Sequence, residues 1–215
     1  MKPDATRIAQ ELATLFPEAK AELNFRNSFE CLCCVMISAQ TTDASVNKVT
    51  PALFAAYPDA FAMAKAKVED VEEKIRSIGL YRNKAKNLVA LSQILVERFD
   101  GQVPSNKEDL RSLPGVGIKT ANVVGGECFG IPAIAVDTHV SRVAKRLGFA
   151  KEDATPEEIE AILEKAFPKE IHIRMHHRMI FFGRRICHSQ KPECGRCPFT
   201  GYCRYFKKTA SNTGK

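Results

Sequence analysis

Four of the eight cysteines lie close together near the C-terminal end of the sequence, in the pattern Cys-x6-Cys-x2-Cys-x5-Cys. They are Cys187, Cys194, Cys197 and Cys203. Thiolates gathered in one short loop are ligands for zinc or for an iron–sulfur cluster. Zinc sites usually present two short cysteine pairs separated by a longer segment, whereas this loop has one Cys-x2-Cys flanked by two more distant cysteines. The spacing therefore favours a [4Fe–4S] cluster, with a structural zinc and a thioredoxin-like redox pair as the alternatives.

A glycine-rich hairpin is the second candidate, in the segment Leu-Pro-Gly-Val-Gly-Ile-Lys-Thr-Ala at 113–121. Gly115 and Gly117 bracket Val116, and glycine permits the tight turn that such a hairpin needs. A helix is predicted to begin at Ile118, and the N–H groups of its first turn could bind a DNA phosphate without recognising a base. The alternative is a plain turn between two helices.

Lys119 and Asp137 are the candidates for catalysis. Lys119 is predicted to lie in the first turn of the helix after the hairpin, where the helix dipole disfavours a further positive charge. An amine at that place is either a phosphate contact or a nucleophile with a lowered pKa. Asp137 is predicted to be the N-cap of an amphipathic helix that ends before Gly148. An ionised carboxylate there can also accept a proton or stabilise positive charge, so both roles stay open.

Helices must position these groups, because almost every segment shows helical periodicity and none alternates convincingly with period two. Apolar helical stripes run through 29–37, 68–78 and 85–99. Capping boxes are predicted at Ser105 with Glu108 and at Thr155 with Glu158. We expect about nine or ten helices joined by short turns, and a disordered tail from Thr209 to Lys215.

The remaining cysteines and two histidines favour packing roles. His172 and His176 have helical i, i+4 spacing but no third ligand for a metal, so we expect them to pack with their polar edges towards solvent or DNA. Small core side chains are expected at Cys31, Cys33, Cys34 and Cys128.

Length and charge limit the class of protein. The sequence has 215 residues, 45% of them hydrophobic, which excludes disorder as the main state. It contains neither a run of about 20 apolar residues nor a signal peptide, so we expect a cytoplasmic protein without membrane contact. The net charge is +7, but the segment 171–215 alone carries +9 and the first 170 residues carry −2. A one-sided basic block indicates a polyanionic partner, most often nucleic acid.

In combination, these motifs resemble the endonuclease III family, whose members are bifunctional DNA glycosylases and abasic-site lyases of base excision repair. The resemblance runs from about Glu22 to Tyr205. The matching segments are Glu-Leu-Asn-Phe at 22–25, Ser-Ala-Gln-Thr-Thr-Asp at 38–43, Ile-Gly-Leu-Tyr at 78–81, the hairpin with its lysine, Val-Asp-Thr-His at 136–139 and the cysteine spacing. The sequence departs from the family pattern at Cys33, at Cys34 and at 125–128, which concerns packing more than chemistry.

The resemblance implies an all-α fold of two interlocked helical lobes. One lobe would be a six-helix barrel over 22–131 that contains a helix-hairpin-helix at about 106–127. The other would be an iron–sulfur domain made of 1–21 and 132–215, with a [4Fe–4S] cluster in the loop 187–203.

The resemblance also implies roles for individual residues. Lys119 would form a Schiff base with the deoxyribose C1′, and Asp137 would be the essential carboxylate. Gln40 would enter the gap left by a flipped base, and Leu80 would be the wedge in the opposite strand. The cluster ligands would be the four cysteines of the loop. Further DNA contacts would be Gly115, Val116, Gly117, His139 and Lys191.

The implied function is repair of damaged double-stranded DNA. The enzyme would remove oxidised pyrimidines by cleaving the N-glycosidic bond and would nick the abasic site by β-elimination, acting as a monomer at the nucleoid. One alternative is a mismatch-specific glycosylase relative, whose pattern lacks a lysine at position 119. The other is a non-catalytic helix-hairpin-helix DNA-binding module, which would not cleave an abasic site.

Overall fold

The computed structural model describes residues 3–212, and within that range the chain contains twelve α-helices, two 3₁₀ helices and no strand. The all-α prediction is confirmed, although the count exceeds the expected nine or ten because short helices such as α4 lack a long apolar stripe. The helices are α1 (Ala5–Leu15), α2 (Ser28–Ile37), α3 (Asp43–Ala56), α4 (Ala60–Ala64), α5 (Val68–Lys74), α6 (Tyr81–Phe99), α7 (Lys107–Ser112), α8 (Ile118–Phe129), α9 (Thr138–Leu147), α10 (Pro156–Ala166), η1 (Lys169–Ile171), α11 (His172–Arg185), η2 (Cys194–Arg196) and α12 (Arg204–Asn212). None of these helices combines the length and apolar character that a membrane span requires.

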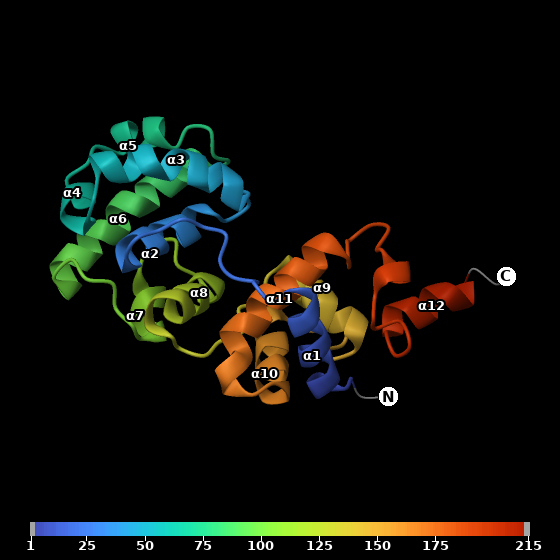
Figure 1. Ribbon diagram of the computed structural model, residues 1–215. Helices are drawn as coiled ribbons and strands as arrows, with labels where there is room; N and C mark the ends of the chain where they lie inside the picture. The colour runs from blue at the N-terminus through green and yellow to red at the C-terminus, as the bar shows by residue number, and fades with distance from the viewer. Residues whose placement is uncertain (1–2, 213–215) are drawn as a thin grey trace. The chain divides into compact units, whose positions relative to one another are not determined.

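The chain divides into two compact units (Figure 1). One unit is Glu22–Ile131, which contains α2 to α8, and the other is Met1–Ala21 together with Pro132–Lys215, which contains α1 and α9 to α12.

The core of the Glu22–Ile131 unit is built around α2. Every residue from Phe29 to Ile37 is buried, so this helix is enclosed on all sides rather than along one stripe. It packs against α8, while α4 and α5 pack against α6. The expected core positions of Cys31, Cys33 and Cys34 are confirmed, and Cys128 is half-buried against the same core.

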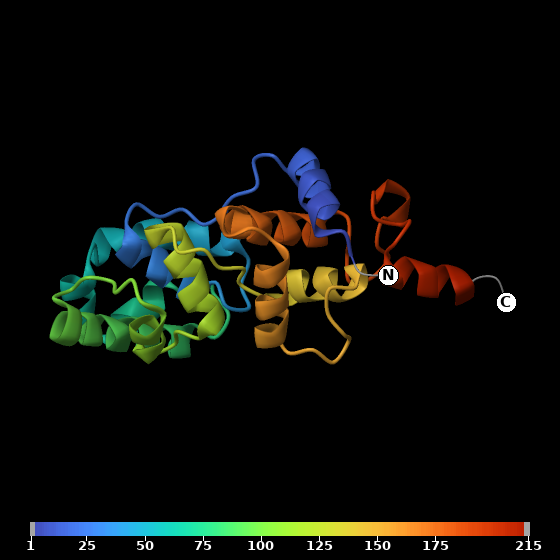
Figure 2. The same ribbon diagram turned by 90° about the horizontal axis from the view of Figure 1, so that it is seen from below.

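The second unit has its own core, in which α1 and α9 pack against α11. The blue helix α1 lies beside the orange helix α11 in both views (Figures 1 and 2). His172 and His176 are buried in this core, where His172 Nε2 lies 3.0 Å from the Phe167 carbonyl and His176 Nδ1 lies 2.8 Å from the Ala135 carbonyl. The predicted packing roles of both histidines are therefore confirmed. The prediction that their polar edges face solvent or DNA is wrong, because a ring nitrogen of each lies beside a backbone carbonyl inside the core.

Helix starts follow from local hydrogen bonds. The capping box of Thr155 and Glu158 is confirmed at the start of α10. The box predicted at Ser105 is wrong, because Asn106 caps α7 and accepts a 2.7 Å hydrogen bond from the N–H of Asp109. The expected disordered tail is also wrong for 209–212, which belong to α12, and 213–215 lie outside the described residues.

Candidate functional site

The hairpin between α7 and α8 presents backbone rather than side chains. Gly115 has φ +78°, and a Cβ placed there would lie 2.7 Å from Nδ2 of Asn87, so both the turn and the close packing require glycine. Val116 is buried, which anchors the hairpin in the core. Gly117 is the N-cap of α8 and provides no side-chain cap, so the first-turn N–H groups lack a side-chain acceptor there. Such N–H groups form an anion-binding site.

Lys119 is the second residue of α8, as predicted, and its side chain is exposed. It forms no ion pair with any of the residues that the structure describes. An ammonium group on the rim of an uncapped helix start is accessible to a ligand that docks on the hairpin.

Asp137 is the N-cap of α9, and this prediction is confirmed. Its Oδ1 accepts a 2.8 Å hydrogen bond from the N–H of Val140. The buried segment 134–136 holds it at the helix start, and its side chain is half-buried. Within the described part of the chain the cap uses only Oδ1, so Oδ2 can interact with another group. Lys119 and Asp137 belong to different units.

Backbone strain marks three of the predicted DNA contacts. Gln40, Leu80 and Lys191 have φ of 55°, 58° and 47°, and among residues 3–212 only Asp100 is a further non-glycine residue with positive φ. Leu80 is also the most exposed of the large hydrophobic side chains, at 59%. Left-handed backbone at non-glycine residues costs about 1–2 kcal/mol each and is concentrated at functional sites. Sequence reasoning could not reveal this strain, because none of the three is glycine or asparagine.

His139 lies in the first turn of α9 against α11. A Cβ on Gly183 would lie 2.9 Å from the Cβ of His139, so a glycine is needed for the two helices to approach. Arg142 Nη2 lies 3.0 Å from His139 Nδ1. Burial, together with the charges of Arg142 and Arg184, lowers the pKa of His139, which favours the neutral imidazole at pH 7.

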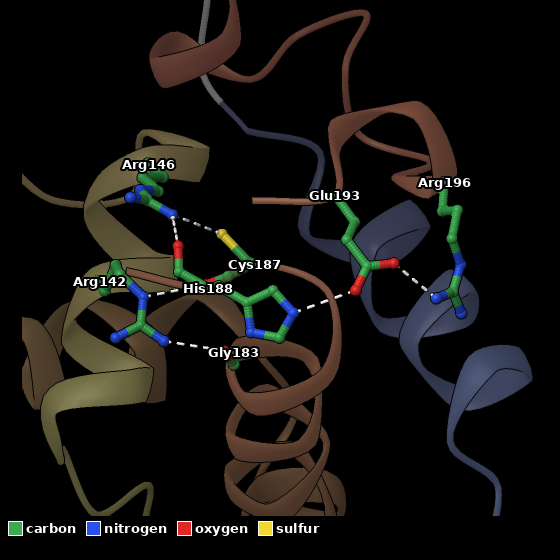
Figure 3. Close-up of polar contacts among 7 residues, drawn as sticks. All are labelled: Arg142, Arg146, Gly183, Cys187, His188, Glu193 and Arg196. Carbon is green, nitrogen blue, oxygen red and sulfur yellow. Dashed lines mark hydrogen bonds and ion pairs between the residues drawn. The ribbon is translucent and has the colours of Figure 1, made fainter. Parts of the chain in front are cut away.

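Two arginines of α9 join this helix to the cysteine loop (Figure 3). Arg142 donates hydrogen bonds to the carbonyls of Gly183, at 2.8 Å, and Cys187, at 2.9 Å. Arg146 donates to the Cys187 Sγ at 3.3 Å and to the carbonyls of His188, at 2.6 Å, and Ser189, at 3.0 Å. The helix that begins at Asp137 therefore also supports the loop.

The four loop cysteines line one pocket, which encloses about 350 Å³ including space open to solvent. Cys203 is buried and donates to the Arg146 carbonyl at 3.3 Å, and the other three are half-buried. Burial raises the pKa of Cys197 to about 11 and also raises the pKa of Cys203. These thiols would become thiolates only beside strong positive charge, which a metal centre supplies.

The pocket fits a polynuclear cluster better than a single ion. A tetrahedral zinc would hold its sulfur ligands about 3.8 Å apart, given a Zn–S distance of about 2.3 Å. In residues 3–212, no three His, Cys, Asp or Glu side chains converge as a single metal ion would require. Four thiols spread around one larger pocket suit a [4Fe–4S] cluster.

The carboxylate of Glu193 links His188 and Arg196 in the cysteine loop (Figure 3). Glu193 accepts hydrogen bonds from His188 Nε2, at 3.1 Å, and Arg196, at 2.6 Å. These bonds, that of His188 first, lower the pKa of Glu193. Lys191 is exposed in this segment, so its side chain is available to an external anion.

Comparison with known proteins gives concordant matches. Residues 33–169 match the HhH-GPD superfamily of base excision DNA repair proteins, and residues 187–203 match the iron-sulfur binding domain of endonuclease III. Endonuclease III of Bacillus subtilis (strain 168) is 47% identical over 198 residues, which cover 92% of this chain and 90% of that protein. Two solved structures, "Structure of a Trapped Endonuclease III-DNA Covalent Intermediate: Estranged-Adenine Complex" and "Structure of a non-covalent Endonuclease III-DNA Complex", each superpose with a TM-score of 0.92 at 50% identity, covering 96% of this chain and 98% of theirs. The resemblance inferred from the sequence motifs is confirmed.

Proposed function

The chain belongs to the endonuclease III family within the HhH-GPD superfamily of base excision DNA repair proteins, and from this premise we propose which of its residues perform the reaction. It is a DNA glycosylase with abasic-site lyase activity, it binds DNA and it carries a [4Fe–4S] cluster. We assign the nucleophile to Lys119, the catalytic carboxylate to Asp137 and the cluster ligands to Cys187, Cys194, Cys197 and Cys203. We assign the barrel and hairpin to the Glu22–Ile131 unit and the cluster domain to the other unit.

We propose that the substrate is an oxidised pyrimidine in damaged double-stranded DNA. The C1′ atom is inaccessible in a stacked duplex, so the nucleotide must be extruded. Extrusion costs a few kcal/mol, and less when the base is damaged and poorly stacked, which favours damaged bases. Leu80 would enter the opposite strand and Gln40 the vacated gap; the exposure of Leu80 and the strained backbone at both residues support this assignment.

The first chemical step breaks the N-glycosidic bond. The base leaves with the bonding electron pair, and positive charge develops on the sugar. Asp137 stabilises that charge as a carboxylate, the departing base takes up a proton, and Lys119 attacks C1′ as the free amine. Oδ1 of Asp137 accepts the capping hydrogen bond from the N–H of Val140, which leaves Oδ2 for this role.

The second step breaks the strand. Lys119 Nζ and C1′ form an iminium as the sugar ring opens, and the iminium acidifies C2′. Loss of the C2′ proton moves an electron pair that expels the 3′ oxygen, so the strand is cut on the 3′ side. Water then hydrolyses the iminium and regenerates the lysine.

The remaining contacts bind the DNA backbone. The amides around Gly115, Val116 and Gly117 would bind one phosphate, supported by the uncapped start of α8. His139 and Lys191 would add contacts from the other unit. The cluster, when bound, supplies the positive charge that keeps four thiolates in one pocket and thereby fixes the loop that carries Lys191.

We further propose that the protein acts as a monomer at the nucleoid, since one chain carries every residue assigned above. A protein mass equal to that of one chain in light scattering, both alone and, after subtraction of the DNA, in complex with duplex, would support the monomer, and twice that mass would refute it.

The observation that carries the assignment of the nucleophile is an exposed lysine beside an uncapped helix start at the hairpin. Its test is cleavage of a panel of single-lesion duplexes by the Lys119→Gln variant. We expect no strand cleavage but affinity for undamaged duplex within about threefold of the parent protein. Lys65→Gln, at the exposed lysine that is the C-cap of α4, is the control and should cleave like the parent. Parent-like cleavage by Lys119→Gln would refute the assignment, and a parent preference for undamaged mismatches would refute the substrate class.

A further inference from the structure

Lys84 is a buried lysine in the first turn of α6, only 5% exposed. Lysine is almost never buried to this degree without a partner. Its Nζ donates a 2.8 Å hydrogen bond to Oγ1 of Thr41, a residue 43 positions away in the chain. Burial lowers the pKa of Lys84, so the contact is maintained against a cost of desolvation.

The two ends of Lys84 contact two strained loops. Its side chain binds Thr41, which directly follows Gln40 with its φ of 55°. Its backbone N–H donates the ordinary i to i−4 helix hydrogen bond, at 3.1 Å, to the carbonyl of Leu80, which has φ 58° and is the N-cap of α6, so position 84 is fixed relative to Leu80. Backbone in this region persists only where the surroundings hold it. Lys84 is therefore a direct link between the Gln40 loop and the Leu80 loop, and all its partners lie in the Glu22–Ile131 unit.

The same face of α6 also supports the hairpin. Asn87 lies three residues after Lys84, which places both on one helix face. Its side chain packs under Gly115, so closely that a Cβ there would lie 2.7 Å from Nδ2. The start of α6 therefore contacts three loops: Leu80 belongs to the first, Lys84 binds the Gln40 loop, and Asn87 packs under the hairpin.

We propose that Lys84 is a positioning residue, which holds the Gln40 and Leu80 loops at a fixed separation so that gap filling and strand wedging occur together. This inference rests on the roles proposed above for Gln40 and Leu80. It predicts that loss of the Lys84–Thr41 contact weakens capture of an extruded nucleotide and leaves binding to intact duplex unchanged, because the hairpin amides and exposed cations are untouched.

The experiment measures affinity for a duplex with a tetrahydrofuran abasic-site analogue and for the undamaged duplex, and takes the ratio as discrimination. Lys84→Met keeps the apolar stem and removes the ammonium, whereas Thr41→Val keeps the shape and removes the hydroxyl. We expect each to lower discrimination about tenfold, the order of a lost charge-assisted hydrogen bond, with undamaged-duplex affinity within about twofold. The double variant should lose no more than either single variant, and Thr41→Ser should stay near the parent protein. A 2-aminopurine base placed opposite the analogue should show a matching loss of the unstacking signal.

The outcomes separate the alternatives. Equal loss of affinity for both duplexes would make Lys84 a phosphate contact and overturn the proposal, as would losses that multiply in the double variant. If Lys84→Met unfolds, Thr41→Val carries the test alone, because Thr41 is only half-buried. Gln40→Ala and Leu80→Ala test the premise: if both keep the parent discrimination, the roles proposed for those residues fail. If both lose it while the Lys84 and Thr41 variants do not, only the positioning proposal fails.

Discussion

Replacing Asp137 by alanine removes a helix cap and a carboxylate at once, and matched variants can separate the two losses. The cap is a 2.8 Å hydrogen bond at a half-buried helix start, and loss of such a cap costs about 1 kcal/mol. For a chain of this size, that corresponds to a fall in Tm of about 2–4 °C. We therefore expect Asp137→Ala to be slightly destabilised and inactive.

Asp137→Asn isolates the chemistry, because an amide oxygen can still accept the hydrogen bond of Val140, but a neutral amide cannot balance the positive charge that develops on the sugar. We expect Tm within about 1 °C of the parent and base excision slowed by about 10² or more. Asp4→Ala is the matched control, since Asp4 caps α1 in the same unit with a 3.0 Å hydrogen bond from the N–H of Arg7. It should lose similar stability and keep parent activity.

The assay is single-turnover excision on a lesion duplex, paired with thermal unfolding followed by circular dichroism. Excision by Asp137→Asn within threefold of the parent would reduce Asp137 to a structural cap. Inactivity of Asp4→Ala would show instead that excision follows stability, and the separation of roles would fail.

Three further results are expected. For undamaged duplex, Lys191→Ala should make the negative slope of log K against log salt less steep by about 0.9. Lys151→Ala, at another exposed lysine, should leave the slope unchanged. A slope unaltered by Lys191→Ala would remove Lys191 from the interface. Because the pKa of His139 is lowered in the folded protein, its contribution to stability is complete above about pH 6.5 and is lost as pH falls from there towards the folded-state pKa. His139→Gln should therefore make the free energy of unfolding in urea vary less between about pH 7.5 and 5.5. An unchanged pH dependence would contradict the shift. Cys187→Ser should lose most of the roughly four irons per chain while Cys128→Ser keeps them, and full iron content in Cys187→Ser would exclude it as a ligand.

Features that depend on neighbouring residues were predictable from the sequence. The cap at Asp137, the capping box at Thr155 and the helix start before Lys119 each involve residues within four positions, so spacing suffices. The Ser105 error has a local cause as well, because serine and asparagine are equally good N-caps and they stand side by side at 105–106.

Features created by distant parts of the chain could not be predicted. Lys84 has the sequence context of an ordinary surface lysine, yet it is buried and its Nζ binds Thr41, 43 residues away. The left-handed backbone of Gln40 and Leu80 likewise runs against the preference of these residue types, so the sequence gives no sign of it. Arg146, which reaches the cysteine loop from α9, carries no motif that would connect it to Cys187 before the fold is known.

Borohydride trapping with peptide mapping shows which amine forms the Schiff base. Reduction during reaction with an abasic-site duplex should convert the iminium into a stable amine, and mass spectrometry of the digested adduct should place the deoxyribose remnant on Lys119. Lys119→Gln should give no adduct while binding the duplex about as tightly as the parent. An adduct on another amine, or trapping of Lys119→Gln at the parent rate, would contradict the assignment of the nucleophile.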